Sequence, residues 1–282
     1  MRVYYYAYTG HKNGLDRLKR ATALLKEFNK EGLDTLLLVN DFRASLVARE
    51  FGIDDSVHIE TIQDIDAIAE IGDVVIIDSP EDDRGRLKKY CSEFKAVIRF
   101  TQSEDDDDSS NYGEIVIDEP VIVDSIYFEE SKKEERTLFF LGDSDTDKTI
   151  LSNADFFKGQ QMELLLGHYF YVKYENDLKK IFKRVHEADE YIELICKSKR
   201  VVTTSLQTAL EARVSGAEVV YILTKSLNKN IKNKLRLLQV ETLQDFDKNI
   251  YKQLMFSNIS NCHINTQRSK NIAKNMMEIM GL

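Results

Sequence analysis

The first half of the chain alternates short apolar runs with segments that have the spacing of amphipathic helices. Arg2–Tyr8 and Thr35–Val39 are nearly continuous apolar or aromatic runs, which are typical of strands covered on both faces. Between them, apolar residues recur every three or four positions from Leu18 to Phe28, which marks one helix face, and Gly32 follows as a stop. The same alternation predicts further helices and strands at Phe42–Phe51, Ser56–Glu60, Ile62–Ile71, Asp73–Ser79 and Lys95–Phe100.

The alternation restarts after a charged segment, Glu129–Arg136, which has no apolar periodicity. A helix is expected at Leu206–Val214 and a final amphipathic helix at Thr266–Met280. Glu175–Lys197 has the pattern of a long helical region that allows a break. The strands expected in this half are Thr137–Leu141, Met162–Leu166, Arg200–Thr204 and Glu218–Leu223.

Strands that alternate with helices predict parallel sheets with right-handed crossovers. The expected fold class is therefore α/β, with two Rossmann-like domains. The charged segment gives the expected division, with residues 1–131 in the first domain and 132–282 in the second, closed by the final helix. Parallel sheets bind ligands at the carboxyl ends of their strands, so the loop after Tyr8 and the segment after Asp78 are the first places to search.

Composition narrows the partners and the compartment. Hydrophobic residues make up 43% and charged residues 31% of the 282 residues, which is an ordinary globular mixture. The net charge of −9 argues against a general affinity for nucleic acid, whose phosphates are bound by basic surface. Three widely spaced cysteines indicate reduced thiols. With neither a membrane-spanning run nor a signal-peptide pattern, a cytoplasmic location is expected.

The segment from Thr203 to Ser205 lies where an expected strand hands over to a helix. Hydroxyls and backbone N–H groups converge at such a helix start, and the positive end of the helix dipole points the same way, which suits a diphosphate. Glu211 lies about two turns into that helix. The alternative is an ordinary helix N-cap with Glu211 on a solvated face, and the pattern leaves both open.

Candidate catalytic residues lie in the loop after the first expected strand and at the end of a later one. His11 is a candidate general base, because an imidazole titrates near neutral pH, and it is equally part of a polar turn without chemistry. Asp16, Arg17 and Arg20 form a mixed-charge helix start, in which the arginines contact a phosphate or pair with Asp16. Asp78 is a candidate by its position at the carboxyl end of a strand.

No metal ion or cofactor is expected. The remaining histidines have no partners at the spacing of metal ligands. The acidic run Glu104–Asp108 lacks the spacing and the glycine of a calcium-binding loop, so it is expected to be a solvated loop.

Three stretches carry a likeness to known proteins: RATALLKEF at Arg20–Phe28 with the LLLV strand after Gly32, LFFLGDSD at Leu138–Asp145, and KRVVTTSLQTALEARVSGAEVVYI at Lys199–Ile222. They resemble the GT-B superfamily, and within it the UDP-sugar hydrolase of pseudaminic acid biosynthesis and the MurG-type N-acetylglucosaminyltransferases. The first is similar to the arginine-led helix of the hydrolase, and the second to the glycine-containing turn that opens the second half. The third is similar to the segment that holds the nucleotide sugar. The order of elements is similar over most of the chain, and the motifs over about a fifth of it.

The resemblance implies two domains that face each other across a cleft, with a nucleotide sugar, expected to be UDP-linked, held by the second. It implies that Glu211 accepts both ribose hydroxyls and that Arg17 or Arg20 contacts phosphate or substrate. The nucleotide-sugar-binding residues implied are Gly142, Ser144, Thr203, Thr204, Ser205, Thr208 and Glu211.

The chain departs from the hydrolase pattern where catalysis is expected. In the hydrolase a glycine and a proposed catalytic histidine precede the arginine, and alignment on Arg20 puts Asp16 and Arg17 at those positions. His11 lies upstream in the same loop. The turn of the second half carries Asp143 after Gly142, and this carboxylate repels a diphosphate unless a cation such as Lys148 compensates.

Two classes of function follow from these residues. The first is an enzyme of surface-glycan biosynthesis that hydrolyses a nucleotide sugar or transfers its sugar, with His11, Asp78 or Asp16 as the catalytic group. The second is a GT-B-shaped protein that has lost catalysis and serves as a binding or scaffolding module. A sugar epimerase with the same fold is a third reading, with less support from specific residues.

Overall fold

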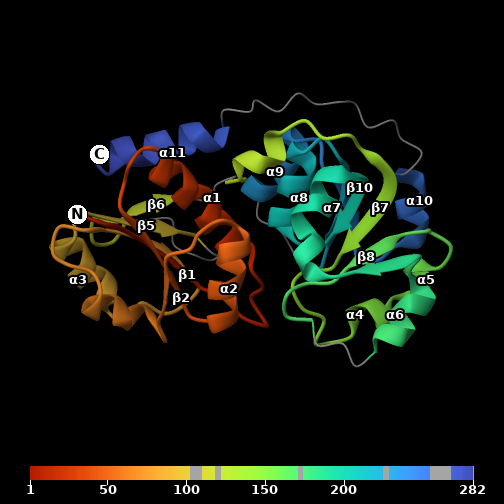
Figure 1. Ribbon diagram of the computed structural model, residues 1–282, viewed down its shortest axis with the longest axis horizontal. Coiled ribbons are helices and arrows are strands. Elements are labelled where there is room, and N and C mark those ends of the chain that lie inside the picture. The colour runs from red at the N-terminus through yellow and green to blue at the C-terminus, as the bar shows by residue number, and fades with distance from the viewer. Residues whose placement is uncertain (102–109, 118–121, 171–173, 225–228, 255–267, 282) are drawn as a thin grey trace. The chain divides into compact units, whose positions relative to one another are not determined.

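The chain forms two compact α/β units, which are drawn in Figure 1. The computed structural model describes residues 1–101, 110–117, 122–170, 174–224, 229–254 and 268–281. Unit 1 comprises Met1–Asp124 and Thr266–Leu282, and unit 2 comprises Ser125–Asn265. The acidic run Glu104–Asp108 lies outside the described residues.

Unit 1 contains a parallel sheet in which the strands described follow the order β3-β2-β1-β4-β5-β6. Its strands are β1 (Val3–Ala7), β2 (Thr35–Val39), β3 (Ser56–His58), β4 (Val74–Asp78), β5 (Ala96–Phe100) and β6 (Ile115–Ile117). Its helices are α1 (Asp16–Lys30), α2 (Phe42–Glu50), the 3₁₀ helix η1 (Ile62–Ala67), α3 (Arg86–Glu93) and α11 (Arg268–Ile279).

Unit 2 contains a second parallel sheet, whose described strands follow the order β12-β11-β10-β7-β8-β9. Its strands are β7 (Glu134–Phe140), β8 (Glu163–Leu165), β9 (Arg184–His186), β10 (Ser198–Thr203), β11 (Glu218–Leu223) and β12 (Glu241–Gln244). Its helices are η2 (Ser125–Phe128), α4 (Thr149–Ser152), α5 (Ala154–Phe157), α6 (Glu175–Ile181), η3 (Ala188–Glu190), α7 (Tyr191–Lys197), α8 (Leu206–Val214), α9 (Lys229–Leu237) and α10 (Lys248–Leu254).

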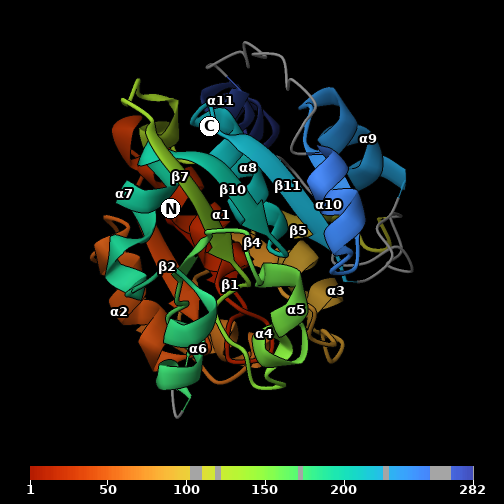
Figure 2. The same cartoon turned by 90° about the vertical axis from the view of Figure 1, so that its right-hand side faces the viewer.

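Both sheets have the strand order of a doubly wound Rossmann fold. In unit 1 the order is 3-2-1-4-5-6, and in unit 2 the strands read in the opposite direction give the same order when β7 is counted as the first. Figure 2 shows β7, β10 and β11 of unit 2 side by side. The expected α/β fold class with two Rossmann-like halves is confirmed.

Each sheet is covered on both faces, which explains its continuous apolar runs. In unit 1, Tyr4 and Tyr6 of β1 pack in a cluster with Tyr90 and Phe94 of the α3 region, while β1 and β2 also contact α1. In unit 2, Phe139 packs among the aromatic rings of α5 and Phe182. The next residue, Phe140, points to the opposite face and contacts Tyr191 of α7.

The predicted long helical region at Glu175–Lys197 is wrong. The chain there forms α6, then β9, then η3 and α7. Strand β9 is only three residues long, so alternation of apolar and polar residues cannot reveal it. It forms because Arg184, Val185 and His186 pair in register with β8.

The division of the chain differs from the expected one at two places. The boundary, expected between residues 131 and 132, falls between Asp124 and Ser125. Within the charged segment, Glu134–Arg136 begin strand β7, where Arg136 pairs with Glu163 of β8. The final helix α11 contacts α1 of unit 1, as Figure 1 shows, and Lys95 Nζ donates to the carbonyl of Gly281 at 2.8 Å. Residues 266–282 are therefore part of unit 1 and not of the second half.

In the part of the chain that the structure describes, no helix has the length and apolar character needed to cross a bilayer. No group of three or more His, Cys, Asp or Glu side chains there is arranged to hold a metal ion.

Candidate functional site

The candidate residues lie at the topological switch point of each sheet, where the strand order reverses. In unit 1 this point lies between β1 and β4, and in unit 2 it lies between β7 and β10. In open α/β sheets ligands bind beside the carboxyl ends of these strands. The turns after β1, β4, β7 and β10 therefore define the two candidate regions.

In unit 1, Asp78 ends strand β4 and is fully buried. Its carboxylate accepts hydrogen bonds from Arg20, Nε at 3.1 Å and Nη2 at 2.9 Å, and from the Tyr5 hydroxyl at 3.0 Å. Arg17 Nε lies 3.6 Å from the same carboxylate. Two guanidinium groups from the first turns of α1 thus meet one carboxylate.

The electrostatics of this cluster follow from burial and from the shared carboxylate. Burial lowers the pKa of Arg17, and Asp78 opposes that shift. Burial and the neighbouring Asp78 raise the pKa of Tyr5, so its hydroxyl remains a proton donor. Asp16 also favours the charged forms of Arg17 and Arg20, so the two guanidinium groups lie near two carboxylates, those of Asp78 and Asp16.

The loop after β1 is a tight turn with His11 exposed near its tip. The N–H groups of Asn13 and Gly14 donate to the carbonyl of Gly10 at 3.0 and 2.8 Å. Asn40, at the end of β2, holds the base of the loop by accepting from the Thr9 N–H at 2.7 Å. This geometry fits both roles considered for His11, the polar turn and the accessible base. Asp16 lies at the start of α1, with its carboxylate 3.8 Å from Lys19 Nζ.

In unit 2, helix α8 begins directly after β10, with Ser205 as its N-cap. Ser205 Oγ accepts from the Thr208 N–H at 3.0 Å, and Thr203 Oγ1 accepts from the Ser205 N–H at 3.0 Å. The Thr204 hydroxyl donates to the carbonyl of Leu141 at the end of β7. These bonds join the turn after β10 to the turn after β7, which contains Gly142.

Glu211 is buried, with an exposed fraction of 1%. The Tyr191 hydroxyl donates to its Oε2 at 2.6 Å, and Gln207 Nε2 donates to its Oε1 at 2.9 Å. Tyr191 also lies 2.7 Å from Thr208 Oγ1. The alternative that placed Glu211 on a solvated face is therefore wrong, because the side chain belongs to an internal polar network.

The turn after β7 needs two glycines for different reasons. Gly142 has φ 140°, a conformation that L-amino acids rarely adopt. Gly167, in the loop after β8, packs so closely on this turn that an added Cβ would lie 2.2 Å from the Asp143 Cα. Close packing brings His168 to the turn, with its Nδ1 3.9 Å from Asp143 Oδ1.

No described ion pair joins Asp143 to Lys148, the cation expected to compensate it; one described neighbour of its carboxylate is His168, which is a cation only when protonated. Lys148 is exposed and adopts a left-handed backbone conformation just before α4. The N-terminus of α4 is filled by Asp145, whose carboxylate accepts from the N–H groups of Thr149 at 2.6 Å and Ile150 at 3.2 Å. Ser144 is half-buried between these two aspartates.

Three contributors were missed in the sequence analysis: Tyr191, Gln207 and His168. Tyr191 was assigned to the interior of a long helix, and it starts α7 because of the unpredicted strand β9. Gln207 lies one turn before Glu211 on α8, a spacing that allows a side-chain hydrogen bond and was a usable signal. His168 depends on the close packing at Gly167, for which the sequence holds no local pattern.

The structure brings predicted residues together in each unit. In unit 1, Arg17, Arg20 and Asp78 form one cluster, and Asp16 acts electrostatically on both of its arginines. The turn at Gly142 and the residues Thr203, Thr204, Ser205, Thr208 and Glu211 form a second group in unit 2.

No protein-family model matches the sequence, and no curated protein matches it. Solved structures do match. The S. aureus MnaA–UDP co-structure has a TM-score of 0.64 and 10% identity, covering 100% of this chain and 97% of that one. UDP-GlcNAc 2-epimerase of Methanocaldococcus jannaschii, in complex with UDP-GlcNAc and UDP, has a TM-score of 0.60 and 10% identity over 99% and 100% of the chains. A glycosyltransferase from Rickettsia africae has a TM-score of 0.53 and 8% identity over 99% and 93%. These likenesses show that the chain has the GT-B fold.

Proposed function

We propose that this chain binds a nucleotide-linked sugar, with the nucleotide held in unit 2 at the start of α8. The observation that supports it most is the buried polar network of Ser205, Thr208 and Glu211 at the carboxyl end of β10, beside the switch point. Buried polar groups are retained at a cost, so a network of this size at a ligand-binding edge favours a binding role. The named ligands of two structural neighbours make a UDP-sugar the first candidate.

In this proposal the diphosphate lies against the N-terminus of α8. The positive end of the helix dipole and the small residues of the two turns, Gly142, Ser144, Thr203 and Thr204, leave room for backbone contacts to phosphate oxygens. Glu211 accepts from the ribose hydroxyls. Its carboxylate is held at both oxygens, by the Tyr191 hydroxyl and by Gln207 Nε2.

The remaining candidate groups of the proposal lie in unit 1. Arg17 and Arg20 are the proposed anion contacts, since both guanidinium groups lie at the start of α1 beside the carboxyl end of β4. His11 is the proposed base. In hydrolysis it takes a proton from water, the oxygen bonds to the anomeric carbon, and the sugar–phosphate bond breaks to release the nucleoside diphosphate. In transfer, an acceptor hydroxyl takes the place of water, and the product belongs to surface-glycan biosynthesis.

A binding or scaffolding protein without catalysis is the second candidate. Asp78, the other candidate base, is fully buried beneath two arginines and a tyrosine, where it is a poor proton acceptor for a substrate. Glu211 is enclosed in the same way by its partners. Both carboxylates maintain internal structure, which a protein that only binds would also require.

The proposal is tested by thermal-shift titration of the chain with UDP, CMP and GDP and with their sugars. A ligand that binds the native state raises the melting temperature as its concentration increases. We expect UDP and UDP-sugars to raise it in a saturable way. An unchanged melting temperature with all of these ligands would contradict nucleotide binding. Any UDP-sugar that binds is then assayed for hydrolysis, transfer and, given the neighbours, 2-epimerisation; binding with no turnover in any assay would favour the scaffold.

A further inference from the structure

The hydroxyl of Tyr191 lies between the two parts of the candidate nucleotide site, the N-cap of α8 and Glu211. We infer that Tyr191 is a positioning residue that sets the Glu211 carboxylate for recognition of the ribose. The inference rests on the proposed function, because it names how that site distinguishes a ribose from a deoxyribose.

The carboxylate of Glu211, where this chain of hydrogen bonds ends, determines which group donates in each of them. A carboxylate only accepts, so the Tyr191 hydroxyl donates its one proton to Glu211 Oε2 at 2.6 Å. Tyr191 must then accept from the Thr208 hydroxyl, which lies at 2.7 Å. Thr208 in turn accepts from Ser205 Oγ at 2.9 Å. The chain of donors therefore runs from Ser205 through Thr208 and Tyr191 to Glu211.

This chain makes the position of Glu211 depend on Tyr191. Burial raises the pKa of Tyr191 well above its ordinary value, and the nearby Glu211 adds to the shift, so the hydroxyl stays a donor. Gln207 Nε2 holds the other carboxylate oxygen at 2.9 Å. These two donors bind different oxygens, so together they fix the orientation of the carboxylate.

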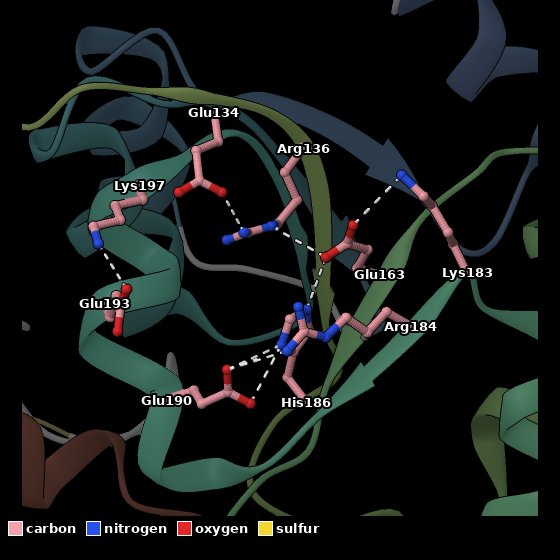
Figure 3. Close-up of polar contacts among 9 residues, drawn as sticks. All are labelled: Glu134, Arg136, Glu163, Lys183, Arg184, His186, Glu190, Glu193 and Lys197. Atoms are coloured by element: carbon pink, nitrogen blue, oxygen red, sulfur yellow. Dashed lines mark hydrogen bonds and ion pairs between the residues drawn. The ribbon is translucent and has the colours of Figure 1, made fainter.

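Tyr191 is itself held in place by packing and by a clamp at the start of α7. Its ring lies edge-on to Phe140 of β7, with centroids 5.3 Å apart. The residue before it, Glu190, has both carboxylate oxygens 3.2 to 3.3 Å from His186 Nδ1. His186 is 1% exposed, and its Nε2 lies 2.8 Å from Glu163 Oε2. Figure 3 shows His186 between these two carboxylates, with Arg136 at the same oxygen of Glu163 and Lys183 at the other.

The clamp connects strands β8 and β9 to Glu190, the residue that precedes Tyr191. A displacement of Tyr191 relative to these strands would break the contacts of the clamp. A side chain fixed from both sides is what a positioning role requires, because recognition of two hydroxyls depends on small displacements. The described contacts of Tyr191 all lie within unit 2.

The test compares binding of UDP and 2′-deoxy-UDP by calorimetry in the wild type and in Tyr191→Phe. Phenylalanine keeps the ring on Phe140 and removes only the hydroxyl. We expect the wild type to prefer UDP, and we expect Tyr191→Phe to lose roughly tenfold or more of its affinity for UDP. Its affinity for 2′-deoxy-UDP should change much less, so the ratio of the two affinities, UDP over 2′-deoxy-UDP, should be smaller in the variant than in the wild type. Tyr251→Phe, which removes a buried hydroxyl from the apolar cluster on the other face of the sheet, should keep the preference.

Each outcome separates the inference from the proposed function. If the wild type binds UDP and Tyr191→Phe keeps the full preference, the positioning role is wrong while nucleotide binding stands. An equal loss for both ligands would also overturn it, because that is the result of a structural defect alone. If the wild type binds neither ligand, the proposed function and the inference both fail. Gln207→Met, which removes the donor on the other oxygen, should narrow the preference in the same way and serves if Tyr191→Phe does not fold.

Discussion

The sequence correctly predicts that Asp78 lies at the end of a strand, but the side chains that contact its carboxylate determine what it can do. A strand end in a parallel sheet is the expected place for a site residue, and Asp78 lies at such an end. The structure adds Tyr5, Arg17 and Arg20, which come from β1 and α1 and occupy the carboxylate. No local pattern in the sequence predicts that three separate side chains share one acceptor.

Replacing Asp78 with asparagine tests whether it is an anchor or a catalytic base. The anchor role predicts a loss of about 3–5 kcal/mol in the free energy of unfolding, because two partly buried guanidinium groups lose their counter-charge. Chemical denaturation followed by circular dichroism measures this loss. Asp34→Asn is the control, since the pair of Asp34 with Arg2 is exposed and should contribute about 0–1 kcal/mol. A stable Asp78→Asn protein that has lost turnover would instead make Asp78 catalytic.

His11 is the residue on which the enzymatic proposal depends most. If it is the base, His11→Ala should lower turnover of a UDP-sugar by on the order of 10²–10⁴, while UDP binding and the melting temperature stay close to wild type. The exposed position of His11 in a turn explains why stability should not change. His58→Ala, at another exposed histidine of unit 1, is the matched control. Normal turnover of the His11 variant would contradict the assignment.

At the scale of elements, the sequence predicted the central strands and the edge strand β3, and it missed three other edge strands. The strands Thr35–Val39 and Glu218–Leu223 have the predicted bounds, because apolar runs covered on both faces leave a clear signal. The helix Leu206–Val214 also has the predicted bounds. Strands β6, β9 and β12, of three or four residues, were not predicted. Their place in the sheet is set by pairing with a neighbouring strand and by side chains from other elements.

The polar cluster around β9 gives a prediction for stability against acid. Burial opposes ionisation of Glu163, but the hydrogen bond from His186 and the charge of Arg136 outweigh it and lower its pKa from the ordinary value of 4.5. A lowered pKa in the folded state means that the ionised form stabilises unit 2. That contribution is fully present above pH 4.5 and is lost as the pH falls through the lower value of the folded state.

Unfolding free energies measured from about pH 6 down to about pH 3 should therefore fall more steeply in the wild type than in Glu163→Gln, which has no such charge to lose. Glu193→Gln, whose partner Lys197 forms an exposed pair, should retain the wild-type slope. Parallel curves for the wild type and Glu163→Gln would show that Glu163 does not provide this acid sensitivity.

For the whole molecule, alternation of strands and helices was enough to predict two Rossmann-like halves, and the structural neighbours show the GT-B fold. The unit to which the C-terminal helix belongs was harder to predict. The final helix was predicted correctly as a helix, but its amphipathic face does not say which sheet it covers, and it packs on α1 of unit 1. The helix start at Ser205 was predicted from its residue types, whereas the burial of Glu211 depends on Tyr191, twenty positions away.

The central claim, that unit 2 holds the nucleotide at the start of α8, is tested most directly by hydrogen–deuterium exchange with and without saturating UDP. Backbone amides that contact a bound diphosphate, or that belong to a helix stabilised by it, exchange more slowly. The account predicts slower exchange in peptides that cover the turn at Gly142–Asp145 and the segment from Thr203 to Glu211, with smaller changes in the far-edge strand β12. UDP that binds, as shown by calorimetry, without slowing exchange in the segment from Thr203 to Glu211 would contradict the claim.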